Sequence, residues 1–136
     1  MGAWGTYPKD SDGALDLFGD ICDVVNKIFE ATADGYGGYE YAGAVMLLLQ
    51  KGFHLDRKIV EKAKKFVEQE MKDTADGKSG WNEPNKAIES MKQVIKGMDE
   101  LLTENKKSKQ ILAPLGWLER KEDREKTNWS GLGFVH

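Results

Sequence analysis

Apolar side chains recur at helical spacing along most of the chain, beginning in residues 12–31. In this segment they return every three or four positions, which places them on one face of an α-helix. This face comprises Leu15, Phe18, Cys22, Val25 and Phe29, with Ile21 and Ile28 beside them. The opposite face carries Asp12, Asp16, Asp20 and Asp23. We expect an amphipathic helix with a wide apolar arc, capped by Asp12 because a carboxylate there accepts from free backbone amides.

A second helix is expected over residues 39–51, where the pattern changes. The run 42–49 is apolar nearly all round, which is typical of a helix surrounded by other helices. We therefore place this hydrophobic second helix at the centre of the domain. Gly52 is its expected end, because glycine readily adopts the left-handed conformation that follows many helices.

Two longer amphipathic helices are predicted in the middle of the chain. The first covers residues 57–72, with Asp56 as its expected N-cap. The second has Asn82 as its expected N-cap and Pro84 in its first turn, and its apolar stripe continues to position 102. Both patterns indicate helices that bury one face and expose the other.

The end of the chain is predicted to be less regular. Residues 108–112 favour a short fifth helix or turn that stops before Pro114. Residues 119–136 form a charged and aromatic tail, which we expect either to fold back on the bundle or to dock on a partner. No segment shows a strong strand pattern. The sequence thus predicts one all-α domain over residues 1–136, a compact bundle of four to five helices.

Composition narrows the class of protein. A chain of 136 residues can bury a core without disulfides, and the single Cys22 is expected to be a buried apolar residue. A net charge of −3 and a pI near 5.5 argue against a dedicated nucleic-acid-binding protein. No signal-peptide pattern is present, and the apolar run 42–49 is too short to cross a membrane. We expect a cytoplasmic protein with neither a nucleic-acid nor a membrane partner.

Residues that could support catalysis or bind metal are few. A calcium loop fails on spacing, because taking Gly13 as its required glycine puts Pro8 at the first ligand position. The two histidines are His54, between helices, and His136, the last residue. Neither stands beside a nucleophile in the sequence, so we predict no catalytic residues, no metal site and no cofactor.

The four tryptophans, Trp4, Trp81, Trp117 and Trp129, all fall outside the helical stripes. A large ring in a loop either closes the end of a bundle or anchors a partner. We expect Trp4 and Trp117 to cap the ends of the bundle. The predicted protein-binding residues are Asp16, Asp20, Asp23, Trp81, Trp129 and Phe134.

The N-terminus resembles the opening of the domain-of-unknown-function 4259 family. The sequence M-G-A-W-G-T is followed by an aromatic–proline pair and D-x-D-x-A-L-D, and the matching positions are Trp4, Gly5, Pro8, Asp12, Ala14 and Asp16. Tyr7, Lys9 and Ser11 depart from the residues usual in that family. The resemblance implies a small, intracellular, mainly helical protein of bacterial or phage type, and it implies no activity.

These observations favour a non-catalytic protein-binding module. One setting is bacterial conflict, in which an immunity-type or phage-encoded inhibitor blocks a toxin or a defence protein. One alternative is a small hydrolase or ligand-binding enzyme that uses Asp12, Asp16 and His54. Another is a structural homo-oligomer held by the apolar second helix or by residues 129–134.

Overall fold

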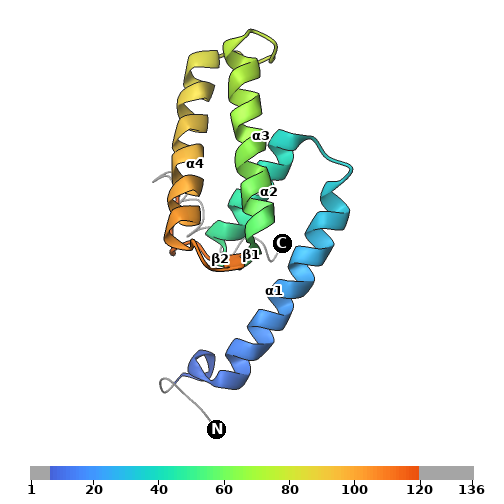
Figure 1. Ribbon diagram of the computed structural model, residues 1–136, viewed down its shortest axis with the longest axis vertical. Helices are drawn as coiled ribbons and strands as arrows, with labels where there is room; N and C mark the ends of the chain where they lie inside the picture. Colours follow the sequence, from blue (N-terminus) through green and yellow to red (C-terminus); the bar gives the residue numbers. More distant parts are fainter. Residues whose placement is uncertain (1–6, 120–136) are drawn as a thin grey trace, which may run out of the picture.

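A computed structural model describes residues 7–119 (Figure 1). Its elements are the 3₁₀ helix η1 (Pro8–Asp10), α1 (Asp12–Ala33), α2 (Gly38–Gln50), β1 (Leu55–Asp56), α3 (Arg57–Ala75), α4 (Pro84–Glu104) and β2 (Gln110–Ile111). The described residues thus form four α-helices and one two-stranded sheet. The predicted all-α bundle is confirmed.

The core lies between α2, α3 and α4. α3 and α4 run antiparallel along the long axis of the molecule, and α2 crosses behind α3 (Figure 1). The largest fully buried side chains of these helices are Val45, Leu49, Ile59, Val60, Met91 and Met98. The predicted central position of the hydrophobic helix is therefore confirmed where α2 faces α3, although Leu47 on its other side is 60% exposed.

Residues 110–111 form a strand, so the predicted short helix or turn over 108–112 is wrong. β2 pairs antiparallel with β1, so that Leu55 stands opposite Ile111 and Asp56 opposite Gln110. Leu55 and Ile111 are both fully buried. The pairing therefore closes one end of the core while satisfying backbone groups that would otherwise be buried without partners.

Arg57 joins the start of α3 to the end of α4. Its backbone N–H donates to the Lys109 carbonyl at 2.8 Å, and its guanidinium donates to the carbonyls of Leu102 at 3.2 Å and Ser108 at 3.1 Å and to that of Asn105. The last carbonyls of a helix lack partners within it, so a fork of donors from another helix is well placed here. One arginine of α3 thus satisfies the C-terminal end of α4.

Two of the predicted helix caps are displaced by one residue. Ser11, not Asp12, caps α1, and its hydroxyl accepts from the Ala14 amide at 3.2 Å. Glu83, not Asn82, occupies the N-cap position of α4, with Pro84 in the first turn as expected. Asp56 and Gly52 keep their predicted places, the glycine with a φ of 87° just after α2.

The apolar arc of α1 is only partly covered. Cys22 is fully buried as expected, and Phe29 packs on the edge of the core. Leu15, Ile21 and Ile28, however, are 49%, 45% and 59% exposed. α1 lies beside the body of the molecule, which comprises α2, α3, α4 and the sheet, and its N-terminal half projects beyond the sheet (Figure 1). Because α2, α3 and α4 bury their apolar faces against one another, α1 packs on them along only one edge.

Candidate protein-interaction site

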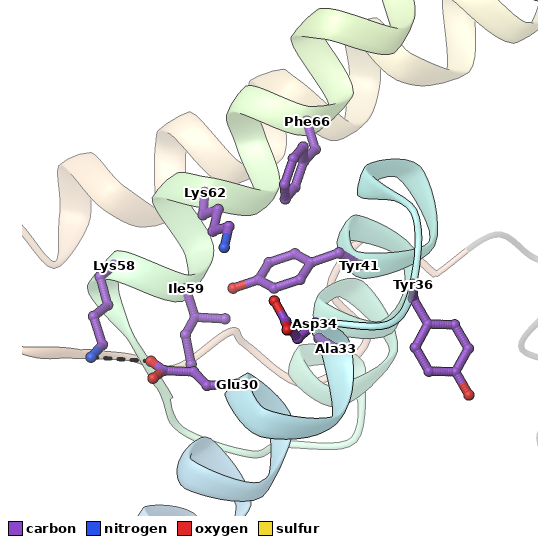
Figure 2. A pocket seen from close by; sticks show the side chains of 9 residues that line it. All are labelled: Glu30, Ala33, Asp34, Tyr36, Tyr41, Lys58, Ile59, Lys62 and Phe66. Atoms are coloured by element: carbon purple, nitrogen blue, oxygen red, sulfur yellow. Dashed lines mark ion pairs between the residues drawn. The ribbon is translucent and has the colours of Figure 1, made fainter.

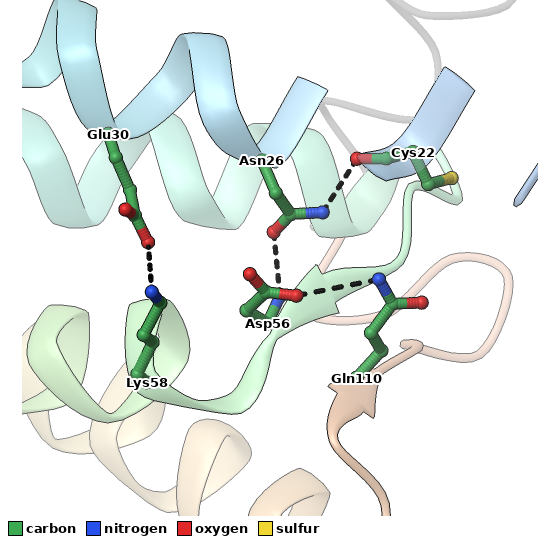
Figure 3. A network of polar contacts seen from close by, with 6 residues as sticks. All are labelled: Cys22, Asn26, Glu30, Asp56, Lys58 and Gln110. Atoms are coloured by element: carbon green, nitrogen blue, oxygen red, sulfur yellow. Dashed lines mark hydrogen bonds and ion pairs between the residues drawn. The ribbon is translucent and has the colours of Figure 1, made fainter. Parts of the chain in front are cut away.

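A buried asparagine fixes how α1 sits on the body. Asn26 is 3% exposed, and its amide nitrogen donates to the carbonyls of Cys22 at 2.7 Å and His54 at 2.9 Å. Its side-chain oxygen accepts from the backbone N–H of Asp56 at 2.7 Å (Figure 3). A buried amide is stable only when its donors and acceptor find partners, so this network selects one rotation of α1 against β1.

Exposed polar contacts flank this network on both sides. Lys58 on α3 pairs with Glu30 at 3.1 Å, and the Gln110 side chain donates to Asp23 at 3.0 Å. Gln110 also reaches Asp56 at 3.4 Å (Figure 3). Exposed pairs of this kind contribute about 0–1 kcal/mol each, so their main effect is to orient the helix.

With α1 held in this rotation, a line of large apolar side chains faces solvent. Leu17, Ile21, Val24 and Ile28 are 61%, 45%, 53% and 59% exposed, and we call them the outward stripe. Val24 and Ile28 follow the inward-facing Cys22 and Asn26 by two positions, which is about 200° around a helix. The outward stripe therefore lies away from the body.

A groove between α1 and α2 continues this apolar surface. Its volume is about 540 Å³, and its lining includes Phe29 and Thr32 of α1 and Ala44 and Leu47 of α2. Thr32 follows Ile28 by four positions and so stands next to it on the helix. The outward stripe therefore leads at its C-terminal end into a mostly apolar groove.

A second cavity, of about 460 Å³, lies between the end of α1, α2 and α3 (Figure 2). Tyr41 and Phe66 line it, with the Lys62 amine 5.2 Å and 5.7 Å from the centres of their rings. Burial, and secondarily the charge of Glu30, raises the pKa of Tyr41 to about 12. The tyrosine therefore stays protonated at neutral pH.

The structure separates the predicted protein-binding residues. Asp16, Asp20 and Asp23 lie exposed on α1. Trp81 lies in the connection between α3 and α4, at the opposite end of the long axis from the N-terminal half of α1 (Figure 1). Its indole N–H donates to Glu70 at 2.9 Å, and the ring is 40% exposed. The aspartates and Trp81 therefore do not form one surface, and Trp129 and Phe134 fall outside the described residues.

The residues of the enzyme alternative lie outside the two cavities described above. The His54 ring packs edge-on against Phe18, with ring centres 5.2 Å apart. Neither the 460 Å³ nor the 540 Å³ cavity is lined by Asp12, Asp16 or His54. Within residues 7–119, no three His, Cys, Asp or Glu side chains are grouped so as to hold a metal ion.

Trp117 behaves as predicted for a residue that closes the bundle, since it is partly buried against the core. Trp4 falls outside the described residues. None of the helices in the described range has both the length and the apolar character needed to cross a membrane.

No family model, curated protein or solved structure matches the chain. The resemblance to the domain-of-unknown-function 4259 family stays a prediction, and two of the residues that carry it, Trp4 and Gly5, precede the described range.

Asn26 and the outward stripe are the two features that sequence reasoning missed. Asn26 interrupts an apolar face four positions after Cys22, which is a signal for a buried polar contact. The sequence pattern places Ile21 and Ile28 beside the apolar face of α1 and gives Leu17 and Val24 no place on it, because the apolar arc of α1 is wide enough to face two directions.

Proposed function

We propose that the protein is a non-catalytic protein-binding module and that the outward stripe of α1 is its contact surface. The observation that carries the proposal is the alignment of four large apolar side chains, each 45–61% exposed, on one face of a helix held by its other face. A contiguous apolar strip of this kind marks an interaction surface more often than scattered exposed residues do.

The size of the strip supports an association of moderate strength. Complete burial of one such side chain is worth about 1.5–3 kcal/mol, so burying the remaining half of four of them contributes about 3–6 kcal/mol before the costs of association. The groove beside Leu47 and Thr32 extends the apolar area. An amphipathic helix of the partner fits a surface of this shape, because its apolar face can lie along the stripe.

The three aspartates predicted to bind protein differ in their position relative to the outward stripe. Asp20 adjoins the outward stripe, whereas Asp23 already accepts a hydrogen bond from Gln110. In the setting of bacterial conflict, the partner is a toxin or a defence protein whose surface the module covers. That setting is a prediction from the sequence.

A capture experiment tests the proposed surface. The tagged full chain is incubated with bacterial lysate and with an untagged copy of itself, and retained proteins are identified by mass spectrometry. Leu17→Gln with Val24→Gln should abolish the specific capture without unfolding the chain, because glutamine retains helix propensity while removing apolar surface. The matched control is Leu115→Gln, since Leu115 is 99% exposed but lies off the helix. Equal capture by all three chains would contradict the proposal.

A further inference from the structure

The outward stripe is part of a longer repeat. When the next position of the same spacing is added at each end, the series is Ala14, Leu17, Ile21, Val24, Ile28 and Ala31, with steps of three and four in strict alternation. This is the heptad spacing of a helix that pairs with another helix along one seam.

The two edges of the seam differ. On the edge that leans toward the body, the flanking residues are Phe18 and Val25, so that edge is apolar. On the other edge they are Asp20 and Lys27, two exposed and opposite charges one heptad apart. This asymmetry decides which arrangement of two copies is favourable.

In a parallel pair, the charged edge of one helix faces the apolar edge of the other, so Asp20 and Lys27 meet no opposite charge. In an antiparallel pair, the charged edges face each other. A two-fold axis between positions 22 and 23 places Ile21 against Val24 of the second copy. The same axis brings Asp20 beside Lys27 of the second copy, and it does so twice because the contact is symmetric.

We propose that the outward stripe binds a second copy of this chain, forming an antiparallel pair of α1 helices. This inference rests on the proposed function, because it names the partner of the same surface. Both the seam and its charged edge are self-complementary, which a surface evolved only for a different protein has no reason to be.

The arrangement leaves room for both bodies. Each body holds the face of α1 that carries Cys22 and Asn26, whereas the seam lies on the other side of the helix. The two bodies therefore lie on the outer sides of the helix pair. The projecting N-terminal half of α1 then runs past the C-terminal half of the other α1, toward the apolar groove that Leu47 lines.

A charge-exchange experiment with the full chain tests the pair. Asp20→Lys and Lys27→Asp each replace two attractions by two repulsions, and each variant should have a dimer dissociation constant raised about tenfold or more in sedimentation equilibrium at low salt. The double variant D20K/K27D should recover the dimer. A mixture of the two single variants should form a heterodimer, because both contacts between positions 20 and 27 then join opposite charges.

Circular dichroism confirms that each variant keeps its helix content. A monomeric wild-type chain at about millimolar concentration would overturn the inference, as would single variants that dimerise as tightly as the wild type. If the wild type is monomeric while L17Q/V24Q still loses capture of a different protein, the pair is refuted and the proposed function stands. If L17Q/V24Q changes neither dimerisation nor capture, both proposals fail.

Discussion

Removing the Asn26 side chain tests how α1 is held on the body. Asn26→Ala deletes the contacts to the carbonyl of His54 and the backbone N–H of Asp56, at 2.9 Å and 2.7 Å. Both backbone groups then lack a partner in a site that is partly closed to water. The Cys22 carbonyl loses less, because it also accepts the ordinary hydrogen bond within the helix.

The expected change in the free energy of unfolding follows from these lost hydrogen bonds. A buried polar group without a partner costs about 1–3 kcal/mol, so two of them cost about 2–6 kcal/mol. Alanine recovers about 0.5 kcal/mol of helix propensity relative to asparagine. We expect a net loss of about 2–5 kcal/mol, limited by the free energy that docks α1, since an undocked helix lets water reach both groups.

Urea unfolding followed by circular dichroism measures the global effect, and amide hydrogen exchange at Asp56 measures the local one. The Asp56 amide should exchange faster in Asn26→Ala by at least about tenfold, even if part of the body remains folded. Asp16→Ala, on the exposed face of the same helix, should change stability by less than about 0.5 kcal/mol. A loss below about 1 kcal/mol for Asn26→Ala, with unchanged exchange at Asp56, would refute the assigned role of the network.

Four further substitutions test the packing and electrostatics of the helices α2, α3 and α4. Arg57→Met should lower the free energy of unfolding by about 2–4 kcal/mol in urea titrations, because three carbonyls near the end of α4 lose a charged donor; no measurable change would exclude the proposed link. Gly38→Ala should destabilise by about 1–3 kcal/mol, since its Cβ would lie 2.4 Å from the Phe66 ring. A Cβ at Gly43 would have no neighbouring atom within 4 Å, so Gly43→Ala should raise the free energy of unfolding by about 0.5–1 kcal/mol. A higher thermal midpoint for Gly38→Ala than for Gly43→Ala would contradict this packing. Tyr41 holds its proton more tightly in the folded state than in the unfolded state. Its proton therefore stabilises the fold fully below pH 10, and this stabilisation is lost as the pH rises toward the folded pKa of about 12. Tyr41→Phe should therefore lose less stability than the wild type over that range, and parallel pH profiles would contradict the raised pKa.

The helices and most of the core could be predicted because their signals are local. Ile59 and Met98 belong to stripes of helical period, and each stripe finds one complementary stripe to pack against. Gly52 likewise ends α2 through its own backbone preference. Where two adjacent residues can both cap a helix, as Ser11 and Asp12 can, the pattern places the end of the helix only within one residue.

The remaining features depend on partners far along the chain. The pairing of Leu55 with Ile111 joins two-residue strands, which are too short to show an alternating pattern. The rotation of α1 depends on Asn26 meeting backbone groups 28 and 30 positions later. Without that contact, the apolar arc of α1 gives no indication of which part of it is buried.

Site-specific photocrosslinking most directly tests the central claim that the outward stripe is a contact surface. A photoreactive residue is placed at Val24, on the stripe, and in a matched chain at Asp16, on the exposed acidic side of the same helix. We predict a covalent adduct from position 24 and little or none from position 16, and an adduct of twice the chain mass identifies a second copy. Adducts from position 16 alone, or equal yields from both positions, would contradict it.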